Sequence, residues 1–237
     1  MRLNKFLAQS GVSSRRRADQ LIQMATTTVN GKICLDPAYD VKPIDIIEYD
    51  NIKISPEKNK IVILLYKPLG ILTTAKDDLG RKTVLDLVDI KLRIFPVGRL
   101  DKNTSGVMLL TNDGDLNQYL THPSNQIPKD YEVIIDKKLL SNDIKKLKKG
   151  LYIGFREFGQ GEILSQQKKK NKSIKIVIRL RQGKKREIRR IMFRLKRNVF
   201  SLKRTRFAGI GLGNLTPGQY RTLSDSETKK LTLKDII

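Results

Sequence analysis

The chain has 237 residues, of which 39% are hydrophobic, and its net charge is +24, from 48 Lys and Arg against 24 Asp and Glu. This length and apolar content exclude a disordered tail and allow one or two folded domains, and the excess of positive charge indicates a polyanionic partner, with nucleic acid the first choice. One cysteine, Cys34, and one histidine, His122, exclude an internal disulfide and a zinc site with the usual ligands.

The same sequence argues against a membrane location. It contains neither an 18-residue apolar span nor a basic amphipathic anchor, so we expect no membrane partner. Residues 1–6 lead directly into a helical pattern, so we expect no signal peptide. A single cysteine suits a reducing compartment, and the cytoplasm is therefore the expected location.

Residues 1–58 are predicted to form a small module of their own. Apolar side chains at helical spacing predict two helices, one before Gly11 and one after a cap at Ser13 or Ser14: Leu3, Phe6 and Leu7 in the first, and Ala18, Leu21 and Ile22 in the second. Asn30-Gly31 between two short runs predicts a hairpin with a type I′ turn, and residues 46–49 predict a further strand. The polar stretch 55–60 is the best candidate for a linker.

Residues 59–237 are predicted to form a second domain that mixes strands and helices. Apolar or alternating runs predict strands over 61–66, 107–111, 131–135 and 173–181. A helix is predicted over 143–149, capped by Ser141 and ended by Gly150. Another helix is predicted beyond Lys184, because its apolar residues recur at positions i, i+3, i+4 and i+7: Ile188, Ile191, Met192 and Leu195.

Positive charge is concentrated in two places. Residues 168–206 contain 18 Lys or Arg and one acidic residue, Glu187, and we interpret them as phosphate contacts rather than as a solvated surface. Only residues 168–172 read as a plain solvated loop. In the first module Arg2, Lys5 and Arg15–Arg17 cluster on the two helices, and Arg15–Arg17 occupy a first turn where the helix dipole favours acids. A ligand phosphate explains that placement better than helix stability does.

The segment GRLDKNTSG, residues 98–106, holds one carboxylate, Asp101, in a polar loop between two apolar runs. Such a loop can present an acidic side chain at the edge of a sheet to an anionic substrate. An ordinary turn residue is the alternative for Asp101, since aspartate is common in turns. No Ser-His-Asp triad can be argued from the single histidine, His122, which reads as a loop residue.

Five ordered segments of the chain resemble the ribosomal RNA pseudouridine synthases of the RsuA/RluB type, and the first module resembles an S-four-type RNA-binding domain. The segments are LYKPLG at 65–70, GRLDKNTSG at 98–106, LTNDG at 110–114, KDYEV at 129–133 and QGKKREIRR at 182–190. The resemblance covers nearly the whole chain. The chain departs from the family pattern at Glu187, where the family commonly has Gln, at Arg181, where an acid is frequent, and in residues 24–28 of the first module.

The resemblance implies a role for particular residues. Asp101 falls on the catalytic aspartate, Arg189 on its arginine partner, and Tyr131 on the tyrosine that lies against the target base. Arg99 falls on the residue that fills the gap left by the displaced nucleotide, and Ile188 on a pocket-lining position. The residues expected to contact RNA are basic and come from both modules: Arg2, Lys5, Arg15, Arg16, Arg17, Lys184, Lys185, Arg186 and Arg190.

The implied reaction is the isomerisation of uridine to pseudouridine in ribosomal RNA or a pre-ribosomal particle, with no metal and no cofactor. The implied fold is α+β, a small αα-β module followed by a domain with a mixed, mainly antiparallel central sheet, flanking helices and a central cleft. Tyr66-Lys67-Pro68 and residues 77–82 favour large-subunit (23S) rRNA, and a monomer is expected. Two points of the mechanism stay open. Asp101 attacks either the sugar or the base, and the final proton is removed either by Tyr131 or by another group.

Two alternatives compete with this interpretation. A non-catalytic RNA-binding or ribosome-associated protein would also carry the first module, but it has no need of the Asp, Tyr and Arg segments of the second domain. A basic DNA-binding regulator is the weaker alternative, because no recognition-helix pattern is visible.

Overall fold

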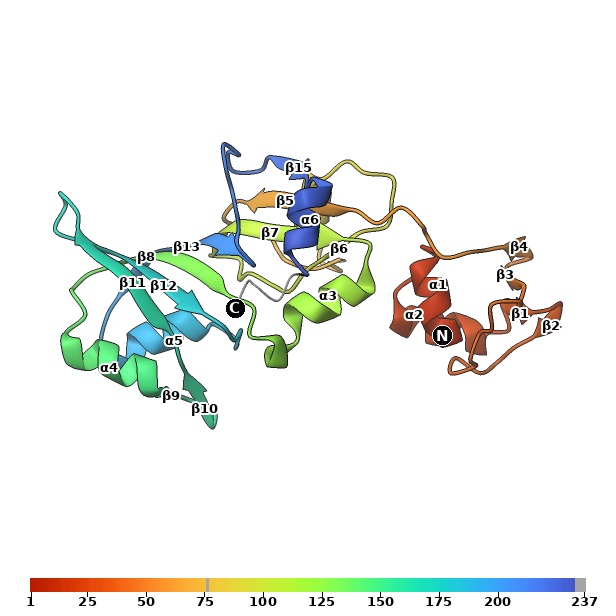
Figure 1. Cartoon of the computed structure of the whole chain (residues 1–237), viewed down its shortest axis with the longest axis horizontal. Coiled ribbons are helices and arrows are strands. Elements are labelled where there is room, and N and C mark those ends of the chain that lie inside the picture. Colours follow the sequence, from red (N-terminus) through yellow and green to blue (C-terminus); the bar gives the residue numbers. More distant parts are fainter. Residues whose placement is uncertain (76, 233–237) are drawn as a thin grey trace. The chain divides into compact units, whose positions relative to one another are not determined.

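The computed structural model describes residues 1–75 and 77–232, which divide into two compact units. The first unit comprises residues 1–61 together with 90–93 and 112–114. The second comprises residues 62–89, 94–111 and the described residues from 115 onward. The predicted α+β class is confirmed in both units (Figure 1).

The first unit is built from two helices and a small sheet, as predicted. Helices α1 (Leu3–Gln9) and α2 (Arg15–Gln23) precede four strands in the order β2-β1-β3-β4: β1 (Thr27–Val29), β2 (Lys32–Ile33), β3 (Ile47–Tyr49) and β4 (Ile52–Lys53). The Ser14 hydroxyl caps α2 by accepting from the Arg17 amide at 3.3 Å. Asn30 and Gly31 have φ values of 52° and 76°, as a type I′ turn requires.

The second unit contains a large mixed sheet in its described part. Its main order is β11-β12-β8-β13-β7-β5-β15, with β6 paired to β7 and β14 to β13. The strands are β5 (Val62–Lys67), β6 (Phe95–Pro96), β7 (Ser105–Thr111), β8 (Lys129–Ile135), β11 (Glu162–Lys168), β12 (Ile174–Leu180), β13 (Val199–Phe207), β14 (Ile210–Gly211) and β15 (Tyr220–Thr222). Among the strand pairs of the described residues, only β13 and β7 run parallel, so the expected mainly antiparallel sheet is confirmed.

Helices cover the two halves of this sheet, each over its own core (Figure 1). Helices α4 (Ser141–Lys149) and α5 (Glu187–Arg194) pack on the half formed by β8, β11 and β12, and the hairpin of β9 (Leu151–Gly154) and β10 (Glu157–Gly159) lies against α5. Helices α3 (Gly114–Thr121) and α6 (Asp225–Lys230) belong to the half around β5 and β7. Short 3₁₀ turns span Leu85–Leu87 and Pro123–Asn125.

The two halves of the sheet join where β7 pairs with β13, and this pairing requires a glycine. Gly106 has a φ of 109°, and a Cβ atom there would lie 2.1 Å from the Arg204 carbonyl oxygen. No side chain fits at such a distance, so Gly106 allows the parallel pairing of Gly106 with Arg204. The pairing of β7 with β13 brings the Asp101 loop, which precedes β7, beside residues of β13.

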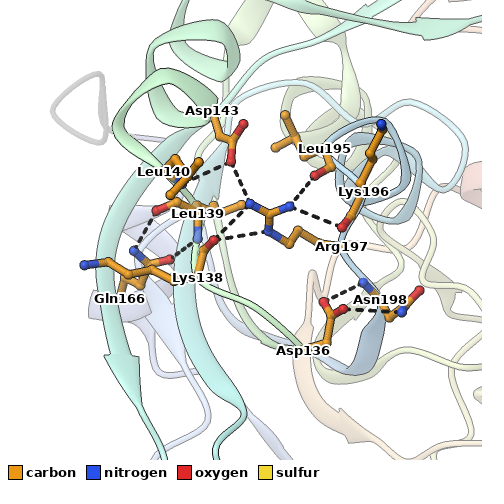
Figure 2. Close-up of polar contacts among 10 residues, drawn as sticks. All are labelled: Asp136, Lys138, Leu139, Leu140, Asp143, Gln166, Leu195, Lys196, Arg197 and Asn198. Atoms are coloured by element: carbon orange, nitrogen blue, oxygen red, sulfur yellow. Dashed lines mark hydrogen bonds and ion pairs between the residues drawn. The ribbon is translucent and has the colours of Figure 1, made fainter.

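Part of the basic stretch 168–206 is structural rather than a phosphate surface. Arg197, after α5, donates to the Asp143 carboxylate at 2.9 Å and to the carbonyl oxygens of Lys138 and Leu195 at 3.0 and 2.7 Å (Figure 2). Asp143 also accepts from the Leu140 amide at 3.0 Å. The N-cap of α4 is therefore Leu140, one residue before the predicted Ser141, and the cap is supplied by Asp143 from inside the helix.

Candidate active site

The second unit contains a cleft of about 580 Å³, a size suited to a small-molecule-sized group such as a nucleoside. Its wall is formed by the loop before β7, the start of β8, the segment 180–188 and part of β13. Of the predicted residues, seven line it: Arg99, Asp101, Tyr131, Lys184, Lys185, Arg186 and Ile188.

Asp101 is held in place by its backbone neighbours. The buried Thr73 side chain donates to the Leu100 carbonyl oxygen at 2.9 Å and accepts from the Leu100 amide at 3.3 Å. The Thr104 amide donates to the Asp101 carbonyl oxygen at 3.0 Å and closes the turn. The loop is therefore fixed at both ends, and its half-buried carboxylate faces the cleft.

Arg189 lies beside Asp101 on α5 but is not hydrogen-bonded to it in the described structure. Its Nη2 atom donates to the Asn103 carbonyl oxygen at 2.7 Å, and its Nε atom is buried without a partner. Burial and the neighbouring Arg186 lower the pKa of Arg189, whereas Asp101 raises it. The predicted pair is thus in electrostatic contact, with one guanidinium donor left unused.

Lys67, which the sequence reasoning did not single out, brings a second cation to this carboxylate. Its side chain is fully buried, and Nζ donates to the carbonyl oxygens of Pro68 at 3.0 Å and Thr104 at 2.9 Å. Burial lowers the pKa of Lys67 to about 8, while the charge of Asp101 acts in the opposite direction. The available signal was a lysine at the end of an otherwise apolar strand, directly before Pro68.

Arg204 is another buried cation at the site that the sequence did not reveal, and it lies beside Tyr131. The two residues face each other in the register of β13 and β8, and the buried Arg204 donates from Nε to the Val107 carbonyl oxygen at 2.7 Å. Burial lowers the pKa of Arg204, and its hydrogen bond with the Tyr131 side chain raises it. Its guanidinium carbon lies 4.7 Å from the centre of the Phe207 ring. Arg204 therefore places a buried cation next to Tyr131.

Ile188 and Glu187 bring the start of α5 into the cleft. Ile188 is buried among the core residues of its half, and Glu187 accepts from the Lys184 amide at 3.0 Å. The other carboxylate oxygen of Glu187 has no partner, and burial raises the pKa of this group. Burial and, to a lesser extent, the charge of Arg204 lower the pKa of Lys129, which also lines the cleft, to about 8, while Glu187 acts in the opposite direction.

The basic residues predicted to contact RNA fall into three groups. Arg2 and Arg15–Arg17 are exposed in the first unit, and Lys5 is half-buried there. Lys185 and Arg186 are exposed at the cleft, and Lys184 donates from Nζ to the Phe158 carbonyl oxygen. Arg190 does not line the cleft, and its guanidinium is bound within the domain; its contact with RNA stays a prediction.

The guanidinium of Arg190 is occupied by its own domain. It forms an ion pair with Glu157 at 2.6 Å and donates to the carbonyl oxygens of Ile153, Gly154 and Lys185 at 3.1, 2.7 and 3.1 Å. These bonds fasten the β9–β10 hairpin to α5. A run of charges in the sequence does not show which guanidinium groups meet carbonyl groups.

Residues 1–75 and 77–232 contain neither a cluster of metal ligands nor a membrane-spanning helix. No group of three or more His, Cys, Asp or Glu side chains there is arranged to hold a metal ion. No helix in that part of the chain has the length and apolar character needed to cross a membrane.

Comparison with known proteins gives consistent similarities along the chain. A family model described as RNA pseudouridylate synthase matches residues 61–193, and an S4 domain model matches residues 1–47. Ribosomal large subunit pseudouridine synthase B of Bacillus subtilis is 38% identical, with 97% of this chain and 95% of that protein aligned. The dual-specificity RNA pseudouridine synthase RluF of Escherichia coli K12 is 34% identical over 96% of this chain and 77% of its own.

A solved structure supports the fold. The crystal structure of a pseudouridylate synthase covers 98% of this chain and 100% of its own, with a TM-score of 0.70 and 24% sequence identity. This likeness extends to the fold alone.

Proposed function

The chain belongs to the RNA pseudouridylate synthase family, and from this premise we propose that it converts one specific uridine of 23S ribosomal RNA to pseudouridine. The choice of large-subunit rRNA is supported by the Bacillus subtilis relative, which aligns over nearly its full length. The observation that carries the proposal is a carboxylate, Asp101, fixed in a cleft of nucleoside size with the cations of Lys67 and Arg189 beside it.

The isomerisation conserves all atoms of the nucleotide except for one exchanged proton. The bond between the sugar carbon C1′ and N1 breaks, the uracil turns, and a bond from C1′ to C5 forms; C5 loses its proton and N1 gains one. The uridine must first leave its stack, which costs a few kcal/mol. In our proposal Arg99 fills the vacancy, Tyr131 lies against the uracil, and Ile188 lines the pocket.

Asp101 is the group that we assign to attack on the substrate, with Arg189 as its positioning partner. The buried Nε of Arg189 has no partner in the structure, so it supports a second hydrogen bond, to Asp101, once a uridine fills the cleft and excludes water. Lys67 adds a further positive charge near Asp101 while its ammonium group donates to the Thr104 backbone.

We assign RNA capture to basic residues of both units, most of which are exposed. Arg2, Lys5 and Arg15–Arg17 belong to a module that we propose to end at residue 58, and Lys184, Lys185 and Arg186 extend from the cleft. The S4 domain match over residues 1–47 supports this role of the module. We also propose that the enzyme acts as a monomer in the cytoplasm, where its rRNA substrate is made.

Tritium release tests the activity and the choice of rRNA together. Unmodified 23S and 16S transcripts labelled with [5-³H]uridine are incubated with the protein, because forming the bond to C5 expels the tritium from that carbon. We expect tritium release from the 23S transcript alone. The amount released should level off at the equivalent of one uridine per transcript. Binding of both transcripts without release would instead support the non-catalytic RNA-binding alternative.

A further inference from the structure

The β9–β10 hairpin is a rigid projection of the second unit. Its turn residues Phe155 and Arg156 both have left-handed backbones, with φ values of 55° and 58°. One face packs on α5 so closely that a Cβ atom on Gly159 would lie 2.6 Å from the Ile191 side chain. The hairpin is therefore held against the helix that carries Arg189.

The other surface of this hairpin exposes aromatic rings. Phe155 is 90% exposed, Phe158 56% and Tyr152 46%. Tyr152 and Phe158 are register partners, and their rings meet edge to face with centres 5.5 Å apart. Exposed aromatic rings grouped in this way are uncommon on a protein surface without a partner.

Arginines lie against these rings and hold them in place. The Arg190 guanidinium carbon lies 5.3 Å from the centre of the Phe155 ring, and that of Arg194 lies 5.5 Å from the Tyr152 ring. Arg190 is itself bound to Glu157 and to the backbone of the hairpin. Because Arg190 occupies only one side of the highly exposed Phe155 ring, the other side is available for stacking.

This surface is continuous with the rim of the active-site cleft. A cavity of about 330 Å³ is lined by Phe155, Glu157, Lys185, Arg186 and Arg190, and Lys185 and Arg186 also line the cleft. The Lys184 ammonium and the Gln182 amide both donate to the Phe158 carbonyl oxygen, which ties the hairpin to the loop 182–184. The acidic group in this cavity, Glu157, is paired with Arg190.

We propose that the β9–β10 hairpin binds unpaired nucleotides of the same RNA strand whose target uridine enters the cleft. An open aromatic face backed by arginine suits base stacking, which is sequence-tolerant and available only where bases are unpaired. The cationic rim formed by Lys185 and Arg186 supplies contacts to the intervening phosphates. This inference rests on the proposed function for the identity of the RNA, but stacking itself does not depend on catalysis.

The absence of tryptophan from the sequence provides a direct probe. In a Phe155→Trp variant the only indole lies at the hairpin, where a stacked base quenches its fluorescence. Phe200→Trp is the matched control, because Phe200 is 66% exposed on β13 and lines neither cavity. Both full-length variants are titrated at low salt with a short single-stranded oligoadenylate and with an RNA duplex of equal length.

We expect the single-stranded probe to quench Phe155→Trp strongly, the duplex to quench it far less, and neither RNA to quench Phe200→Trp. Absence of quenching in Phe155→Trp, or equal quenching by single strand and duplex, would overturn the inference and leave the exposed rings for a different class of partner. Quenching without tritium release by the wild-type protein would support the hairpin surface while refuting the proposed function; release without quenching would do the reverse.

A kinetic readout adds a second check. Phe155→Ala should raise KM for the 23S transcript by about 5- to 20-fold, as expected for one lost stacking contact, with kcat unchanged. Phe200→Ala should change neither constant. A fall in kcat without a change in KM for Phe155→Ala would contradict a role in binding flanking nucleotides.

Discussion

Lys67 and Arg204 are charged side chains with almost no exposed surface, and their contacts show what a local sequence pattern does not report. Asp101, Tyr131 and Ile188 were predicted because their short segments carry a recognisable pattern. Lys67 acts through the carbonyl oxygen of Thr104, 37 residues away, and Arg204 through that of Val107, 97 residues away. Only the pairing of strands creates these contacts, so no local sequence pattern reports them.

The depressed pKa of Lys67 predicts a specific pH dependence of stability. Between about pH 8 and 10.5 the unfolded chain keeps a proton on Lys67 that the folded chain has lost, so this residue makes the free energy of unfolding rise with pH across that window. Relative to Lys67→Met, wild-type protein should therefore gain up to about 3 kcal/mol from pH 7.5 to 10.5. Urea denaturation at several pH values measures this gain; a difference independent of pH would show that Lys67 is not desolvated.

Arg189 and Arg186 should separate chemistry from binding. Arg189→Ala removes the partner of Asp101 and should lower the single-turnover rate at saturating RNA by at least about 100-fold, while the Kd for RNA changes little. Arg186→Ala, on the exposed rim of the same cleft, should weaken RNA binding with a normal single-turnover rate. An Arg189→Ala enzyme with weaker affinity and a normal rate would contradict the role given to Arg189.

Helices and strands whose apolar residues recur at a regular spacing were predictable from the sequence. A strand whose pattern is interrupted by basic residues was not. Strand β12 alternates apolar and polar residues and α5 has one apolar face, so both were confirmed close to their predicted bounds. Strand β13 lies between β8 and β7 in the middle of the sheet, yet its sequence VFSLKRTRF was read only as part of the basic stretch. Its Arg204 is tolerated inside because β7, β8 and Phe207 supply partners, which is a tertiary effect.

The contacts of Arg197 predict a loss of stability when its side chain is removed. Arg197→Ala removes the cation of a largely buried ion pair, so that Asp143 keeps only the Leu140 amide as a donor and the carbonyl group of Lys138 loses the guanidinium. The free energy of unfolding should fall by about 3 kcal/mol, measured by urea denaturation. Lys145→Ala, an exposed change on α4, is the control and should cost little. Equal stability of the two variants would show that the Arg197 contacts do not hold α4 and α5 together.

At the level of the whole chain, the two units differ in how far local sequence signals predict them. The order of two helices, a hairpin and a further strand in the first unit was predictable from local signals such as Asn30-Gly31 and the Ser14 cap. The mixed sheet of the second unit was known only through the family resemblance, because its pairings join residues far apart in the chain. The limit of the first module at residue 58 stays a prediction.

Salt dependence tests the module's role in the full-length protein. Changing Arg15, Arg16 and Arg17 together to Gln should reduce the slope of log affinity against log salt by about 2 to 3, because each phosphate contact contributes about 0.7 to 0.9. The single-turnover rate at saturating RNA should stay within a few-fold of wild type. The matched control changes Lys169, Lys170 and Lys172 of the exposed hairpin turn to Gln. An equal loss of slope in both variants would mean that net charge alone attracts the RNA.

The most direct test of the account is pseudouridine formation in unmodified 23S rRNA by wild-type protein and Asp101→Asn, with the RNA affinity of each measured alongside. Asparagine keeps the size of the side chain and removes its negative charge. We predict that the wild-type protein forms pseudouridine at a single position, and that Asp101→Asn forms none while binding the same RNA within a few-fold. Turnover by Asp101→Asn close to that of wild type would contradict the central claim.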